Sequence, residues 1–150
     1  METMTKIRTY EVTLRRRRTI RVAEATVSNE RAASRAALAW YRDVLPAGES
    51  VLCIGVDGRN AIVGIVEIAR GGLHGAAVVP ADVFRAAFAM GASAVVLAHN
   101  HPSEDPTPSP EDLHMTRALV SCGELLGIPV LDHLTVAVRS GETRSCMGDR

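Results

Sequence analysis

The sequence predicts one α/β domain in which helices flank a mixed β-sheet. Its 150 residues are 47% hydrophobic and 23% charged, which is the range of a single globular domain. Strand-length runs of β-branched residues alternate with Ala-rich and Leu-rich stretches of helical length. No internal repeat or low-complexity tract divides the chain, and aromatic residues make up only 3% of it. We therefore expect one aliphatic core.

Residues 1–46 are predicted to add a basic strand and a helix to this domain. Residues 7–22 mix β-branched and charged side chains, which indicates one long strand or a hairpin. Ser28 is a favoured helix N-cap residue, and the Ala-rich sequence after it predicts a helix to about Val44. The tripeptide Pro46-Ala47-Gly48 then ends this helix.

Residues 47–150 are predicted to form the core of the domain, and they begin with a hairpin. Two apolar runs, residues 51–56 and residues 61–68, are separated by the tetrapeptide Asp57-Gly58-Arg59-Asn60. An Asp-Gly pair between two such runs is a strong signal for a tight turn between antiparallel strands.

The second half of the chain is predicted to alternate helices and strands. A glycine-rich connection at residues 71–75 precedes a helix that starts near Pro80, since proline is favoured at the first helical position, and ends at Gly91. Residues 93–98 are continuously apolar, which is typical of a central strand covered on both faces. The last predicted elements are a helix and two strands, over residues 109–126, 128–138 and 142–146.

The formal charge is zero, but it is unevenly distributed. The first 42 residues contain ten Lys and Arg against four acids, and the remainder contains seven against thirteen. Such asymmetry is typical of a nucleic-acid-binding arm, here carried by Arg15, Arg16, Arg17 and Arg18. The alternative is a solvated edge strand whose charges oppose aggregation. We favour the edge strand, because the aromatic residues that stack on single-stranded bases are scarce there.

The sequence contains no sign of a membrane helix, a signal peptide or a disulfide framework. No apolar run approaches the roughly 20 residues of a membrane helix, and the first residues lack the apolar segment of a signal peptide. The three cysteines, Cys53, Cys122 and Cys146, are widely spaced and odd in number, which favours neither a disulfide framework nor a thiolate metal site. We expect a soluble, cytoplasmic protein that has no membrane partner.

Two histidines and an aspartate are the strongest chemical signal. His99 and His101 stand at the carboxyl end of a predicted buried strand, where a side-chain repeat of two directs both imidazoles to one face. A stiff, proline-rich loop follows, and Asp112 lies in the first turn of the next predicted helix. Imidazole and carboxylate both bind zinc, and three protein ligands with an open fourth position are typical of a catalytic zinc site.

Each of these residues also has an ordinary explanation. Histidines are common at strand ends, and Asp112 three residues after Ser109 matches a helix capping box. Metal binding explains all three together. His133, beside Asp132 in a predicted strand, is either support for this site or a satisfied core histidine.

Glu67 is a candidate general base. It is the only charged residue in the apolar run 61–68, and a carboxylate is costly to bury without a partner. Water at a metal site is such a partner, and a raised pKa would suit proton transfer near neutral pH. The alternative is a glutamate on an edge strand that faces solvent.

The stretch His99-Asn100-His101-Pro102, followed by Ser109-Pro110-Glu111-Asp112, resembles the signature of the JAB/MPN metalloprotease superfamily. That signature is HxHP, seven residues counted from the proline, and then SxxD. More narrowly, residues 51–138 resemble the RadC-type branch. The further matching features are Glu67 with Arg70-Gly71, Val79-Pro80, residues 95–102, Asp105-Pro106, Pro108-Ser109 and Leu131-Asp132-His133.

The resemblance implies a fold and a set of residue roles. The fold is a mixed sheet flanked by helices, similar to the cytidine deaminase fold. His99, His101 and Asp112 would be the ligands of one zinc ion. Glu67 would be the general base for the attacking water, and Ser109 would help to stabilise the oxyanion.

Two features depart from the RadC-type pattern. Glu104 stands where that branch usually has glycine, and a non-glycine residue with positive φ costs on the order of 1 kcal/mol. The helix-hairpin-helix DNA-binding module of larger RadC-type proteins is absent from the sequence, and the arginine-rich segment does not resemble it.

We therefore expect a zinc-dependent hydrolase that cleaves an amide bond in a peptide or isopeptide substrate. The alternatives are a nucleic-acid-associated protein, either repair-related or a metal-dependent nuclease, and a catalytically silent scaffold. Ligands for only one metal argue against the nuclease, and the intact ligand set argues against the scaffold. The absence of HxE with PCxxC argues against a zinc deaminase. The sequence does not decide whether the chain works alone or as a homodimer.

Overall fold

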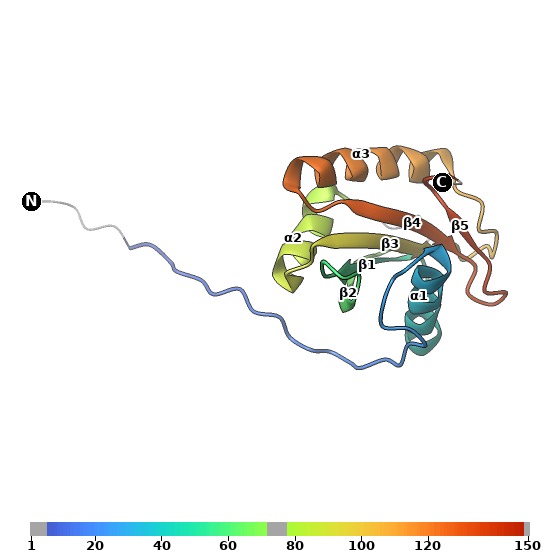
Figure 1. Ribbon diagram of the computed structural model, residues 1–150, viewed down its shortest axis with the longest axis horizontal. Coiled ribbons are helices and arrows are strands. Elements are labelled where there is room, and N and C mark those ends of the chain that lie inside the picture. The colour runs from blue at the N-terminus through green and yellow to red at the C-terminus, as the bar shows by residue number, and fades with distance from the viewer. Residues whose placement is uncertain (1–5, 72–77, 149–150) are drawn as a thin grey trace, which may run out of the picture.

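A computed structural model describes residues 6–71 and 78–148, in which three helices cover the two faces of a five-stranded sheet (Figure 1). The elements in chain order are α1 (Glu30–Val44), β1 (Ser50–Val56), β2 (Ile62–Arg70), α2 (Pro80–Met90), β3 (Ala94–Asn100), α3 (Pro110–Leu126), β4 (Val130–Val136) and β5 (Thr143–Ser145). This confirms the predicted α/β class with a mixed sheet flanked by helices.

The sheet has the strand order β2-β1-β3-β4-β5. The pair β3 and β4 is parallel and is joined through α3, whereas the other pairs are antiparallel. The predicted hairpin of β1 and β2 is confirmed, with Asn60 in a left-handed conformation at its turn. Because helices cover both faces of the central strands, every residue of β1 and β3 is buried.

Alternate residues of the central strands pack into two separate apolar clusters. Val96 and Ala98 of β3 face α1, together with Leu52 and Ile54 of β1. The intervening Val95 and Leu97 face α2 and α3, which lie together on the opposite side of the sheet in Figure 1. By the same alternation, the next odd-numbered residue of β3, His99, faces α3.

The predicted N-terminal strand is wrong. Residues 6–23 have no regular secondary structure, and Figure 1 shows the first part of this segment running away from the sheet. The first β-bridge of the described residues joins Thr26 to Ala61. Strand propensity is expressed only where another strand supplies hydrogen bonds and a buried face. Tyr10 and Val12 are more than 80% exposed, and although Ile20 and Val22 near the end of the segment pack against the core, no described strand pairs with residues 6–23. The edge-strand interpretation of the arginines is therefore wrong too.

Several boundaries differ from the predicted ones by a few residues. The N-cap of α1 is Asn29 rather than Ser28, because the Asn29 side chain accepts the Ala32 N–H at 2.9 Å. The starts of α2 and α3 agree with prediction, and Gly91 ends α2 with a φ of 64°. Strand β3 extends beyond the predicted 93–98, and the last two strands are shorter than predicted. Most of the predicted connection at residues 71–75 lies outside the described residues.

Among the described residues, none of the helices combines the length and apolar character that crossing a membrane requires.

Candidate metal centre

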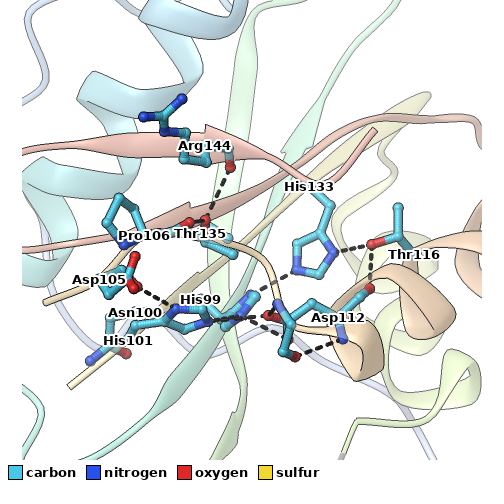
Figure 2. A network of polar contacts seen from close by, with 12 residues as sticks. His99, Asn100, His101, Asp105, Pro106, Asp112, Thr116, His133, Thr135 and Arg144 are labelled. Atoms are coloured by element: carbon cyan, nitrogen blue, oxygen red, sulfur yellow. Dashed lines mark hydrogen bonds and ion pairs between the residues drawn. The ribbon is translucent and has the colours of Figure 1, made fainter. Parts of the chain in front are cut away.

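The three predicted ligands meet where the β3–α3–β4 crossover begins. His99 is the sixth residue of β3, His101 follows the end of that strand, and Asp112 is in the first turn of α3. Their donor atoms all lie within 4.8 Å of one another, and Figure 2 shows the three side chains converging. The sequence-based prediction that a strand end and a helix start aim these residues at one point is confirmed.

The distances within this cluster are short. His99 Nε2 lies 2.9 Å from His101 Nε2. One oxygen of Asp112 reaches each histidine, with Oδ1 3.1 Å from His99 Nε2 and Oδ2 3.2 Å from His101 Nε2. The His99 side chain is fully buried and that of His101 is 17% exposed, so the cluster is accessible from the His101 side.

The helix start orients the Asp112 carboxylate. Oδ2 of Asp112 accepts the Ser109 backbone N–H at 2.8 Å, and Ser109 Oγ accepts the Asp112 N–H at 3.1 Å. This is the capping box that the sequence allowed as an alternative to metal binding, and the capped carboxylate also faces both histidines. Burial opposes ionisation of Asp112, but hydrogen bonds with His101 and His99 outweigh it and hold the carboxyl pKa well below its usual value.

The donor chemistry fits a metal ion. His101 Nδ1 lies 2.7 Å from the Asp105 carbonyl oxygen, which can only accept, so Nδ1 carries the proton in the neutral ring. Without a cation, the hydrogen bond with Asp112 raises the pKa of His101, which favours a proton on Nε2 that is donated to the carboxylate. In the neutral ring, His101 Nε2 presents a lone pair to the cluster. It faces an ionised carboxylate and a second imidazole nitrogen, and such a convergence of acceptors is stabilised by a cation. Two imidazoles with one carboxylate are a common ligand set for zinc.

Glu67 is not joined to this cluster by a hydrogen bond among the described residues. Its carboxylate accepts from Ser50 Oγ at 2.7 Å and from Arg70 Nη2 at 2.8 Å. Glu67 lies opposite Leu52, whose partner on the other side is Ala98, so its side chain leaves the sheet on the face of Ala98 rather than that of His99. Its predicted role as general base stays a prediction.

Asn100, between the two histidines, links Glu67 to the motif. The Asn100 side-chain oxygen accepts the Ser50 backbone N–H at 2.8 Å, and its amide donates to the Gly48 carbonyl. Ser50 thus contacts both Glu67 and the strand that carries the histidines. Neither Asn100 nor Ser50 was predicted from the sequence to support the site. The available signal for Asn100 was its place between the two histidines of the motif, at the end of β3.

Glu104 has the positive φ that its place in the loop indicated. Its φ is 64°, and its N–H donates to the His101 carbonyl at 2.9 Å, which closes a tight turn directly after the second histidine. The Glu104 carboxylate accepts the Arg139 N–H at 2.9 Å. This contact ties the loop to the segment after β4 and offsets part of the backbone strain.

Comparison with known proteins agrees with this site. The sequence model described as the RadC-like JAB domain matches residues 27–147, which include α1, the whole sheet and all three candidate ligands. The chain belongs to the RadC-like JAB domain family. The observed mixed sheet with flanking helices is consistent with a JAB/MPN-like fold, and the match includes α1, which the sequence analysis had set apart from the core.

Curated relatives of this RadC-like JAB domain are bacterial. A UPF0758 protein of Geotalea uraniireducens is 47% identical over 88 residues, which are 59% of this chain and 39% of the relative. A UPF0758 protein of Clostridium perfringens is 41% identical with the same coverage. One of Caldanaerobacter subterraneus is 49% identical over 78 residues, 52% of this chain and 34% of the relative. The chain thus spans less than two fifths of the length of these relatives.

Proposed function

We propose that this RadC-like JAB domain is a zinc-dependent hydrolase that cleaves an amide bond in a peptide or isopeptide substrate. The observation that carries the proposal is the convergence of His99, His101 and Asp112 within 4.8 Å. Membership of the RadC-like JAB family supports the same ligand set. A zinc ion at this position supplies Lewis acidity towards a carbonyl oxygen and lowers the pKa of a water molecule.

Ser109 would stabilise the developing charge on the carbonyl oxygen. Its Oγ accepts a hydrogen bond from Asp112 N, and the hydroxyl proton has no acceptor among the described residues. That proton is therefore free to be donated to an oxyanion. Helix α3 begins at the next residue, Pro110, and the positive end of its dipole favours negative charge beside Ser109.

Glu67 would take the proton of the attacking water and return it to the leaving amine. Its carboxylate is oriented by Ser50 and Arg70 and is partly exposed, with 26% of the side chain accessible. A carboxylate that is held in place but not fully buried can exchange protons with water and substrate. Because Glu67 shares the face of Ala98, the variant Glu67→Gln tests this role directly.

A nucleic-acid function has one supporting observation, the exposed basic segment. Arg15, Arg16 and Arg17 lie in an exposed stretch, and Arg18 pairs with Asp43 of α1 at 2.8 Å. Binding through these arginines would weaken steeply with salt. Against a two-metal nuclease, the described residues contain one cluster of metal-ligating side chains, and it holds three residues.

Three proteins test the proposal: the wild type, His99→Ala and Glu67→Gln. Each is measured for bound zinc and then for turnover of peptide, isopeptide-linked and DNA substrates. We expect His99→Ala to lose zinc and activity. Glu67→Gln should keep zinc and lose amide hydrolysis. Asp82→Asn is the matched control, because Asp82 also forms an i,i+3 ion pair with an arginine, at 2.8 Å, but lies on α2.

The outcomes separate the alternatives. If the protein binds zinc and hydrolyses only DNA, the proposed substrate is a nucleic acid rather than an amide. Zinc binding without turnover of any substrate would favour a scaffold. Full activity in Glu67→Gln would remove Glu67 from the mechanism while leaving the metal centre in place. A wild-type protein that binds no zinc would refute the proposal.

A further inference from the structure

A line of hydrogen-bonded side chains leads from Thr116 of α3 through His133 of β4 to the candidate ligand His99 (Figure 2). Thr116 Oγ1 lies 2.6 Å from the Asp112 carbonyl oxygen and 2.6 Å from His133 Nδ1. His133 Nε2 lies 2.8 Å from His99 Nδ1. Thr116 is 3% exposed, and both histidines are fully buried, so water does not compete for these hydrogen bonds.

The donor and acceptor of each hydrogen bond in this line can be deduced from the bond between Thr116 and the Asp112 carbonyl. A carbonyl oxygen only accepts, so the single hydroxyl proton of Thr116 is donated to the Asp112 carbonyl. Thr116 Oγ1 must then accept from His133, which places a proton on His133 Nδ1. His133 is fully buried, and its hydrogen-bond partners are Thr116 and His99 rather than a carboxylate, so its ring is neutral and carries no second proton. His133 Nε2 is therefore an acceptor.

The same logic carries over to His99. Because His133 Nε2 accepts, His99 must donate from Nδ1, which leaves the Nε2 lone pair of the neutral ring directed at His101 and Asp112. His101 reaches the same state through the Asp105 carbonyl. Both neutral rings are thus held in the tautomer that binds a metal through Nε2. The Asp105 carbonyl holds His101, and the side chains of His133 and Thr116 hold His99.

On this geometry we infer that Thr116 and His133 are positioning residues that hold His99 in its metal-binding tautomer. The inference rests on the metal centre of the proposed function. Neither residue contacts the ion or the substrate. Their effect is indirect: without the Thr116 acceptor, His133 is free to carry its proton on Nε2. His99 would then have to accept at Nδ1 and present an N–H to the metal site instead of a lone pair.

Substitutions at the two positions should separate this role from simple packing. Thr116→Val keeps the shape of the side chain and removes the acceptor, whereas Thr116→Ser retains a hydroxyl. We expect Thr116→Val to lower zinc affinity by about 10- to 100-fold, which is typical when the partner of a metal-ligating histidine is lost. Thr116→Ser should stay within about three-fold of the wild type, a change small against that loss. His133→Gln, whose amide oxygen can accept from His99, should bind zinc more tightly than His133→Leu.

The control for loss of a buried hydroxyl is Ser34→Ala. Ser34 is 8% exposed, and its Oγ lies 2.8 Å from Thr143 Oγ1, on the α1 side of the molecule. Ser34→Ala should lower the stability of the protein without changing its zinc affinity. Affinity is measured by competition with a chromophoric chelator at neutral pH for all of these proteins.

A second measurement needs no variant. Nitrogen-15 NMR of the metal-free wild type reports which ring nitrogen of each histidine carries the proton. We expect Nδ1 to be protonated in the neutral rings of His99, His101 and His133. Protonation of His99 on Nε2, or wild-type zinc affinity in Thr116→Val, would overturn the inference. A wild type that binds no zinc but shows the expected tautomers would refute the proposed function alone.

Discussion

Ser109 and Asp112 bind each other twice, once through each residue's backbone N–H. The Asp112 carboxylate accepts from Ser109 N at 2.8 Å, and the Ser109 hydroxyl accepts from Asp112 N at 3.1 Å. Only the second of these bonds needs the serine side chain. The orientation of the Asp112 carboxylate is therefore provided by the backbone, and the hydroxyl serves the helix cap and, in the proposed mechanism, the substrate.

Ser109→Ala should therefore keep zinc but lose activity. Removal of the cap should lower the free energy of unfolding by about 1 kcal/mol. Loss of an oxyanion donor should lower kcat by about 100- to 1,000-fold. Asn29→Ala is the control, since Asn29 caps α1 by the same kind of bond at 2.9 Å. An equal loss of activity in Asn29→Ala, or loss of zinc in Ser109→Ala, would contradict the division of roles.

Removal of zinc should lower the thermal stability of the wild type but not that of His99→Ala. A ligand that binds only the folded state stabilises it by about 2.7 kcal/mol when present at 100 times its Kd. The midpoint of thermal unfolding is measured with and without a chelator. His114→Ala, which changes an exposed histidine of α3, should respond to the chelator as the wild type does. A chelator shift of equal size in His99→Ala would place the ion elsewhere.

Glu104 offers a direct test of backbone strain in the loop. Its φ of 64° lies in the left-handed region, where glycine is about 1 kcal/mol better than other residues. Glu104→Gly and Glu104→Ala both lose the bond to Arg139 N, so comparing them isolates the backbone. We expect the glycine variant to be more stable by about 1 kcal/mol in denaturant unfolding of the metal-free proteins. Equal stability would mean that the loop relaxes.

The buried hydroxyl of Tyr41 should make the stability of the protein fall as the pH rises into the alkaline range. Its buried hydroxyl lies 2.7 Å from the Ser50 carbonyl and 3.1 Å from that of Ala98, and burial raises its pKa well above the usual value. Above pH about 10 the unfolded chain loses this proton while the folded chain keeps it. The unfolded state then binds fewer protons, so the free energy of unfolding falls, by up to about 1.4 kcal/mol per pH unit.

Tyr41→Phe isolates this effect from the other groups that titrate at alkaline pH. The variant should be less stable than the wild type near neutral pH by about 1 kcal/mol, because the two carbonyls lose their donor. The difference should shrink as the pH rises above about 10, the usual tyrosine pKa. Tyr10→Phe, at an 81% exposed position, is the control and should follow the wild type throughout. A constant difference across the alkaline range would contradict the assignment.

The convergence of the candidate metal ligands could be predicted because their geometry is mostly local. A repeat of two places His99 and His101 on one face of any strand, and a capping box places Asp112 in the first turn of a helix. Strand β3 is longer than the apolar run at residues 93–98 because it also contains the polar residues His99 and Asn100. They are paired with β4, and a single sequence does not show that pairing.

Contacts between distant parts of the chain were the ones that could not be predicted. Thr116 and His133 meet because α3 packs on β4, and Ser50 reaches both Glu67 and Asn100 because β1 lies between β2 and β3. The predicted strand over residues 7–22 failed for the same reason, since local propensity says nothing about whether a neighbouring strand is available.

The three donors and the two residues behind them all lie between positions 99 and 133, within a single strand–helix–strand unit. Glu67 belongs to the preceding hairpin instead. In the proposed mechanism, a substitution in that hairpin silences turnover while ion capture survives, so the two abilities could be lost separately in evolution.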